Sequence, residues 1–241
     1  KPLAPEESKN LSLGFTLHPF SGFDLTVDGY QIKITDQIYS TSNIAVTPAI
    51  AAAMASAGVP GASSIAQVRF FQNAFDSTTK GVDVVGTYKY NWENGQRTTF
   101  TGAFNMNTFK IDEIKIAGLF NAQSVFNFEN NAPRWRGILT LNHVVGDFTF
   151  TLRDNIFGHS KIQSTVAPFP IQTYKAGVQQ IDLDVKYAFS ETYSVSVGGR
   201  NIFDKYPDKD KLQLLTNGSQ WRDGPIDIQG GFYYVRLDAK F

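Results

Sequence analysis

Apolar and polar residues alternate along most of this chain, with the period of two that places side chains on opposite faces of a β-strand. The clearest stretch is QIDLDVKYAF at 180–189, where every second residue is apolar and charged residues stand between them. Similar stretches recur from residue 11 to the closing GFYYVRLDAKF at 231–241. The pattern predicts an all-β protein with about nine antiparallel strands.

Two places depart from this alternation. Within FDLTVDGYQIKI at 23–34 the apolar positions shift by one residue at Asp28-Gly29, which predicts a β-bulge. The stretch AIAAAMASAGV at 49–59 is bounded by Pro48 and Pro60 and is too short to cross a membrane as a helix. It predicts a short helix within a loop.

The connections between the predicted strands alternate in length. Tight connections follow the first, third, fifth and seventh strands, whereas long ones occupy 40–67, 109–132, 158–176 and 203–229. Loops of this length are uncommon in compact soluble domains. Short turns at one end of a sheet and long loops at the other are typical of outer-membrane β-barrels, with short periplasmic turns and long extracellular loops.

Strand length and aromatic placement favour the same class. Strands of roughly 9–13 residues suit a tilted crossing of a bilayer. Aromatic residues gather at both ends of the strands, as in the two girdles of membrane barrels. At the short-turn ends these are Phe20, Tyr90, Trp92, Phe189, Tyr193 and Phe241. At the long-loop ends they are Tyr39, Phe109, Trp135, Phe157 and Tyr233. We therefore expect the apolar faces to contact outer-membrane lipid, with a soluble β-sandwich as the alternative.

Composition narrows the chemistry. The chain has 22 basic and 22 acidic residues, so its net charge gives no reason to expect nucleic acid as a partner. It has no cysteine and three widely spaced histidines, and its acidic pairs lack the spacing of a calcium-binding loop. We predict no catalysis, no cofactor and no bound metal.

Five segments carry a family resemblance. They are PEESKNLSLGFTLHP at 5–19, LTVDGYQIKITDQI at 25–38, QNAFDSTTKGVDV at 72–84, GGRNIFDKYP at 198–207 and GGFYYVRLDAKF at 230–241. In this order and spacing they resemble the C-terminal part of the barrel of TonB-dependent receptors of Gram-negative outer membranes. The fourth segment has one residue fewer before its tyrosine than the family's Asn-Leu-Phe-Asp-Lys-x-Tyr motif.

The resemblance covers residues 1–241 and implies about the last nine strands of a barrel of roughly 22. An odd strand count fits a piece of such a barrel, because bacterial single-chain barrels have even numbers. Nothing in the chain resembles the family's plug domain or TonB box. The implied function is active uptake of a scarce, bulky solute such as a ferric siderophore, cobalamin or an oligosaccharide. A passive porin and a soluble lectin or adhesin remain alternatives.

The resemblance also implies the candidate site residues and partners. The residues expected to line the barrel lumen are Asp182, Asp184, Lys186, Arg236 and Asp238. The loop residues expected to contact a small-molecule ligand are Arg69, Phe70, Phe71, Trp221 and Arg222. Phe241, with Tyr233, resembles the signal read by the barrel-assembly machinery. Further expected partners are the receptor's own plug domain and TonB. The charged wall residues also have a purely structural interpretation, in which they pair with one another.

Overall fold

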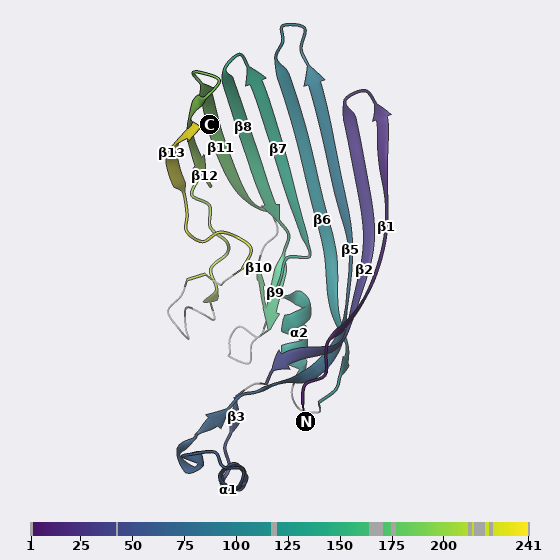
Figure 1. Ribbon diagram of the computed structural model, residues 1–241, viewed down its shortest axis with the longest axis vertical. Helices are drawn as coiled ribbons and strands as arrows, with labels where there is room; N and C mark the ends of the chain where they lie inside the picture. Colours follow the sequence, from purple (N-terminus) through teal and green to yellow (C-terminus); the bar gives the residue numbers. More distant parts are fainter. Residues whose placement is uncertain are drawn as a thin grey trace.

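The computed structural model describes residues 2–41, 43–116, 120–163, 171–174, 177–211, 214, 220–221 and 224–240. Nine strands form one antiparallel sheet, in which every strand pairs with the next one along the chain (Figure 1). They are β1 (Glu7–Phe20), β2 (Phe23–Ser40), β5 (Phe71–Asn91), β6 (Arg97–Ile114), β7 (Trp135–Val145), β8 (Phe148–Phe157), β11 (Val178–Ala188), β12 (Tyr193–Arg200) and β13 (Phe232–Ala239). The predicted all-β fold and strand number are confirmed.

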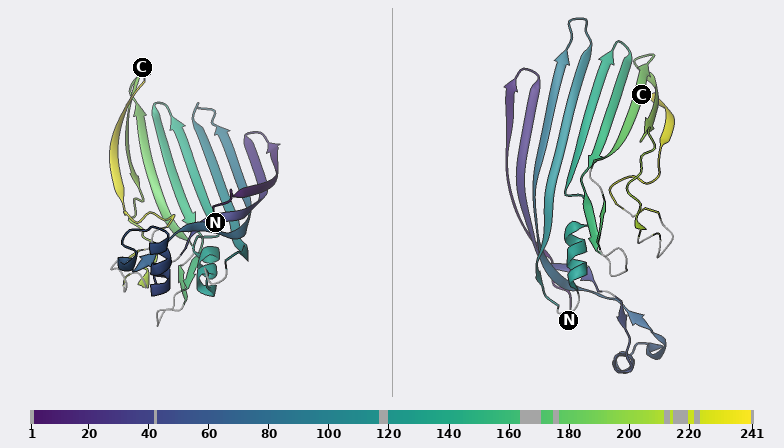
Figure 2. Two further views of the ribbon diagram at one scale, coloured as in Figure 1. Left: turned by 60° about the horizontal axis from the view of Figure 1, so that its bottom comes forward. Right: turned by 180° about the vertical axis from the view of Figure 1, so that it is seen from behind.

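The sheet is curved and open, with β1 and β13 as its two edges (Figure 2). Its strands range from 8 to 21 residues, so several are longer than the predicted 9–13. Among the residues that the structure describes, no helix has the length and hydropathy needed to span a bilayer.

The two ends of the sheet differ as the sequence predicts. Tight connections join β1 to β2, β5 to β6, β7 to β8 and β11 to β12. Gly22 in the first of these turns has a φ of 80°, which disfavours any residue with a side chain. The opposite end carries the long connections. Their elements are β3 (Ile44–Ala45), α1 (Pro48–Ser56), η1 (Ala62–Ser64), β4 (Gln67–Val68), α2 (Ala122–Asn130), β9 (Ser160–Gln163) and β10 (Ile171–Tyr174).

Helix α1 is the loop helix that the sequence predicts, and its caps explain its bounds. Thr47 accepts a hydrogen bond from the Ile50 amide, and Pro48 occupies the first turn, where a missing N–H costs nothing. Helix α2 begins in the same way, because the Asn121 side chain accepts from the Ser124 amide at 2.8 Å. The alternation of apolar and polar residues predicts neither α2 nor the β9–β10 hairpin.

The β-bulge predicted at Asp28-Gly29 is wrong. The pairing of β1 with β2 runs without a shift from Glu7↔Thr35 to Leu17↔Leu25, and that of β2 with β5 is equally regular through this point. The face that carries Val27 continues with Gly29, Gln31 and Lys33, so it simply turns polar. The apparent slip therefore marks the end of an apolar band, and irregular pairing begins only after Ile34.

The register separates two faces of the sheet. We call the face that carries Leu152, Leu183 and Val235 the apolar face, and the opposite one the polar face. Leu152 lies directly across from Leu183 on one neighbouring strand and from Leu141 on the other, so three aliphatic side chains stand side by side on this face. On this face the exposed fraction reaches 82% for Leu13 and 77% for Leu237. No second layer of the described chain covers these side chains.

Rings at the short-turn end form a belt on the apolar face. Neighbouring rings lie 4.7 to 6.4 Å apart between centroids. The members of this aromatic belt are Phe20, Phe23, Tyr88, Tyr90, Trp92, Phe148, Phe150, Tyr187, Phe189 and Tyr193. The predicted girdle is confirmed at this end for the described residues.

At the long-loop end the girdle prediction is wrong for three of its five residues. Trp135 and Tyr233 lie on the apolar face, but Phe109 and Phe157 alternate onto the polar face. Tyr39 packs against the rings of Phe75 and Phe128 instead of facing outward. Successive residues of a strand point to opposite faces, so a shift of one position moves a ring from the apolar to the polar face. Nearness to the end of the strand does not reveal which face a ring is on.

The inward-turned rings form a small hydrophobic core around α2. Tyr39, Phe75, Phe120 and Phe128 have ring centroids 5.0 to 6.0 Å apart, and Phe75 is only 1% exposed. We call these rings, with Ala74, Phe109, Ile111 and Val125, the α2 cluster. Helix α2 is tied to β9 as well, because Asn127 exchanges hydrogen bonds with the backbone of Gln163.

Candidate functional site: the polar face and the long loops

The five residues predicted to line a lumen share the polar face. Asp182, Asp184 and Lys186 alternate with the aliphatic positions of β11, and Arg236 and Asp238 do so on β13. Strand β12 joins the two, since its Ser196 pairs with both Lys186 and Arg236. The structure therefore brings all five onto one patch of wall.

Most of these charges contact neighbouring protein groups. Asp182 Oδ1 accepts a hydrogen bond from the Asn201 amide at 2.9 Å. Asp184 Oδ2 accepts from the Tyr234 hydroxyl at 2.7 Å, and Arg236 Nε donates to Asp238 Oδ2 at 3.2 Å. These contacts favour the structural interpretation for the carboxylates, which position strands β11, β12 and β13 against one another.

The lack of a side chain at Gly198 allows the Tyr234 hydroxyl to reach Asp184. A Cβ placed on Gly198 would lie 2.6 Å from the Tyr234 hydroxyl oxygen. The tyrosine therefore crosses β12 above a residue without a side chain to reach β11. This arrangement fixes the Tyr234 ring within the polar wall.

Two arginines that sequence reasoning missed complete the patch. Arg153 on β8 is the register partner of Asp182, and Arg200 is the last residue of β12. Together with Arg236 and Tyr234 they line a depression of about 270 Å³ on the polar face. Alternation in TLRDN (151–155) could have placed Arg153 on this face, but only the register shows which residues it joins.

The GGRNIFDKYP segment has a structural role. Asn201 has a φ of 47° and is 2% exposed, and its side chain bonds both the amide and the carbonyl of Lys205. Gln180 donates to the Lys205 carbonyl at 3.1 Å, and Asp204 accepts from the Gly231 amide at 2.9 Å. The motif closes the end of β12 and guides the chain towards β13.

The predicted loop residues lie at the first and the fourth long connection and differ in their contacts. Arg69 Nε donates to the Thr41 carbonyl at 3.4 Å, which closes the base of the first long connection. Phe70 and Phe71 are 50% and 67% exposed, whereas Trp221 stacks on Tyr206 with centroids 4.7 Å apart. Arg222 and Phe241 lie outside the described residues.

Beside that stack, the hydrogen bond from the Tyr206 hydroxyl to the Asp204 carboxylate raises the pKa of Tyr206. Gly230 lies against the same hydroxyl, since a Cβ there would approach it to 2.3 Å. Tyr206 and Trp221 therefore order their own loop, which weakens the prediction that Trp221 is free to contact a ligand.

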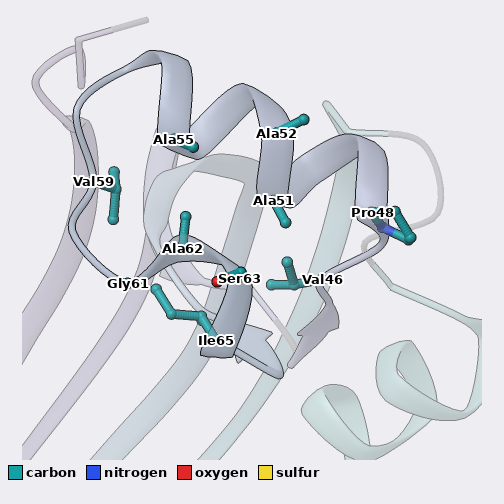
Figure 3. Close-up of a pocket in the computed structure, with 10 residues that line it drawn as sticks. All are labelled: Val46, Pro48, Ala51, Ala52, Ala55, Val59, Gly61, Ala62, Ser63 and Ile65. Carbon is teal, nitrogen blue, oxygen red and sulfur yellow. The ribbon is translucent and has the colours of Figure 1, made fainter.

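The first long connection forms an uncharged arm. No Asp, Glu, Lys, Arg or His occurs between residues 41 and 68, and α1 has no buried residue. Figure 3 shows Val46, Val59 and Ala62 around the space between α1 and the η1 turn. This hollow measures about 660 Å³ and is lined almost entirely by small apolar side chains.

A charged clasp holds the long-loop end of β2, β5 and β6. Lys115 Nζ lies 2.6 Å from Asp36 Oδ1 and 2.8 Å from Asp76 Oδ1. Hydrogen bonds to these two carboxylates raise the pKa of Lys115. Burial alone would raise the pKa of Asp76, but the Lys115 ammonium and the Asp36 amide outweigh it and lower that pKa. In the described part of the chain, no three His, Asp or Glu residues are placed to hold a metal ion.

Comparison with known proteins identifies the class. The family model described as TonB dependent receptor-like, beta-barrel matches residues 1–202, and the chain therefore belongs to this family. The comparison with curated proteins gives no match.

Solved structures share the fold at low sequence identity. The copper transporter OprC superposes with a TM-score of 0.61 at 13% identity, over 99% of this chain and 32% of OprC. The FrpB iron transporter from Neisseria meningitidis gives 0.63 at 11%, over 98% of this chain and 31% of FrpB. A mutant of the ferric enterobactin receptor PfeA from Pseudomonas aeruginosa gives 0.60 at 16%, over 99% and 32%. This chain spans about a third of the length of these proteins.

Proposed function

We propose that the chain forms part of the barrel wall of an outer-membrane TonB-dependent transporter that takes up a scarce, bulky solute. The observation that carries this proposal is the division of the sheet into two faces. The apolar face exposes rows of aliphatic side chains above a belt of rings, and the polar face carries charge. A hydrocarbon layer outside and an aqueous bore inside would satisfy both faces.

The two-faced sheet also separates this proposal from a soluble sandwich. Leu183, Val235 and Leu237 would have to lie beneath a second layer in a sandwich, yet their exposed fractions are 39%, 71% and 77%. A passive porin shares the two faces, so membership of the TonB-dependent receptor family is what favours energised uptake.

For the solute we favour a metal complex. The structural relatives are named as a copper transporter, an iron transporter and a ferric enterobactin receptor. In the proposed transporter the nine strands form part of a larger barrel that also holds a plug domain and is energised by TonB. The long loops face the extracellular side, and α2 narrows the mouth of the bore.

Growth and uptake under metal limitation test the proposal. The gene for the complete protein is deleted, and uptake of radioactive iron and copper complexes is compared in the parent, the deletion strain and a strain lacking TonB. We expect both deletions to abolish uptake of the same complex. Uptake that survives loss of TonB would show a passive pore, and a chain recovered in the soluble fraction would contradict the membrane assignment.

Assembly provides a second proposal from the closing strand. Tyr233 is 66% exposed on the apolar face, and its hydroxyl donates to the Ile202 carbonyl at 3.0 Å. We propose that Tyr233 and the C-terminal Phe241 form the signal read by the barrel-assembly machinery. Deletion of Phe241 from the complete protein should lower the amount of heat-modifiable barrel in the outer membrane, and an unchanged amount would contradict the signal.

A further inference from the structure

The polar wall contains two guanidinium groups that form no ion pair within the part of the chain that the structure describes. In the described chain, no hydrogen-bond acceptor contacts the side chain of Arg153 or Arg200, and no carboxylate oxygen lies within 4.0 Å of either. Both side chains are exposed on the polar face. Every other charged group in the depression has a contact, so these two arginines need a separate explanation.

Their separation follows from the strand register. Arg153 pairs with Asp182, and Gly199, which precedes Arg200, pairs with Leu183. Arg153, Asp182 and Arg200 therefore lie in one row across three strands. Adjacent strands are about 4.8 Å apart, so the two arginine backbones are roughly 10 Å from each other. Side chains of this length can converge on one group placed between them.

Asp182, which lies between the two arginines, bonds other donors with both of its oxygens. Asp182 Oδ1 accepts from the Asn201 amide at 2.9 Å, and Oδ2 accepts from Asn155 at 3.4 Å. Asp184 is held by Tyr234, and the depression as a whole contains three arginines and two aspartates. Both carboxylates thus bond donors other than Arg153 and Arg200, and these two guanidinium groups face the open side of the depression without an ion-pair partner among the described residues.

We propose that Arg153 and Arg200, with Arg236 below them, form a subsite for one carboxylate or phosphate group of the transported solute. A guanidinium fork matches the two oxygens of such a group and can bond both at once. The depression, at about 270 Å³, has room for a single anionic group. The solute would therefore bind here through one group, transiently, during its passage along the wall. This assignment rests on the proposed function, because the polar face must line the bore.

The test measures anion binding to the complete receptor purified in detergent. Radioactive inorganic phosphate and malonate are the probes, and equilibrium dialysis gives the stoichiometry and affinity. The wild-type protein should bind either probe saturably at one equivalent. The double variant Arg153→Gln/Arg200→Gln should weaken this binding at least about tenfold, since each bidentate charged contact contributes strongly.

Two further variants make the result specific. Lys89→Gln/Arg97→Gln removes two positive charges from the same face near the short turns and should bind like the wild type. Arg153→Lys/Arg200→Lys keeps the charge without the fork and should fall between the wild type and the glutamine variant.

Several results would overturn the subsite. They are no binding by the wild-type receptor, equal affinity in the glutamine variant, and an equal loss in the Lys89/Arg97 control. Absence of wild-type binding would be expected if an acidic side chain of the same protein filled the position. Uptake remains a separate measurement: lost anion binding with intact uptake would reject the subsite alone, and intact anion binding without uptake would reject the transport function alone.

Discussion

The two ends of the sheet use aromatic rings in opposite ways. At the short-turn end the rings lie on the apolar face and contact one another in a belt, with Phe148 and Tyr187 4.7 Å apart and Phe148 43% exposed. At the long-loop end Tyr39 and Phe75 turn inward and pack on α2, where Phe75 is 1% exposed. The rings of the aromatic belt are exposed on the surface of the described chain, whereas those of the α2 cluster form a small core.

The difference shows where each end obtains its stability. In the proposed membrane placement a belt ring is contacted by lipid, which adapts when a neighbouring ring changes. A ring in the α2 cluster has fixed protein neighbours, so its removal leaves a cavity that cannot fill. The connection that carries α2 is therefore anchored by a core that behaves like that of a small soluble domain.

The largest expected effect is in the α2 cluster. Phe75→Ala should destabilise the packing of α2 by about 3–5 kcal/mol, because the ring is fully buried among Tyr39, Phe120 and Phe128. Hydrogen exchange of residues 122–130 in the complete receptor measures this as lost amide protection. Phe150→Ala in the belt is the matched control and should leave that protection unchanged. Equal protection in both variants would show that α2 is held by its hydrogen bonds to β9 instead.

The next effect compares the two faces at a single point. Val84 lies on the apolar face between Val27 and Phe104, and Val85 lies on the polar face between Thr26 and Ala103. In lipid vesicles Val84→Arg should lower the free energy of unfolding by about 2–4 kcal/mol, whereas Val85→Arg should change it by less than about 1 kcal/mol. Urea titration followed by tryptophan fluorescence measures both variants. Equal losses would contradict the assignment of the apolar face to lipid.

Much of the wall could be predicted from sequence, because alternation is a local signal. The strand number, the alternation of short and long connections and the shared face of Asp182 and Arg236 all follow from a period of two. The error at Asp28-Gly29 has a physical cause: a face whose residues change from apolar to polar along one strand imitates a bulge. Alternation indicates which residues share a face, but the surroundings of each face change along the strand.

The long loops and the arginine pair could not be predicted in the same way. Phe109 and Phe157 have the residue type of a girdle. Only their alternation relative to the apolar-face residues of the same strand places them on the polar face. Helix α2 depends on contacts between segments distant in sequence, such as Asn127 with Gln163. The row of Arg153 and Arg200 depends on the register across three strands. These features are long-range, and single-segment patterns contain no information about them.

Replacement of Asp154 should change the free energy of unfolding by a smaller amount and should stabilise the protein. This carboxylate lies on the apolar face, directly between Leu139 and Ile181, and its Oδ1 is buried without a hydrogen-bond partner. Asp154→Leu should therefore raise the free energy of unfolding in lipid vesicles by about 1–2 kcal/mol, since an unsatisfied buried polar group costs energy. Asp238→Leu on the polar face is the control and should not stabilise. Destabilisation by Asp154→Leu would indicate that a partner with a hydrogen-bond donor covers this position.

The smallest effect concerns the clasp and depends on pH. Asp76 has a lowered pKa in the folded protein, so its contribution to stability is present above the ordinary value of 3.8 and is lost as the pH falls through the lowered value. Lys115 has a raised pKa, so its contribution is complete below 10.5 and is lost only as the pH rises beyond it.

The Lys115→Met variant tests this pH dependence. It should be less stable than wild type at pH 5 and pH 7. The difference should shrink towards pH 3, as the pH falls below 3.8 and towards the lowered pKa of Asp76. Urea midpoints at the three pH values measure it. Lys80→Met is the control, because no carboxylate of the described residues lies within 4.0 Å of Lys80. A pH-independent difference for Lys115→Met would show that the lysine acts through its aliphatic packing, as the core residues of the α2 cluster do, and not through its charge.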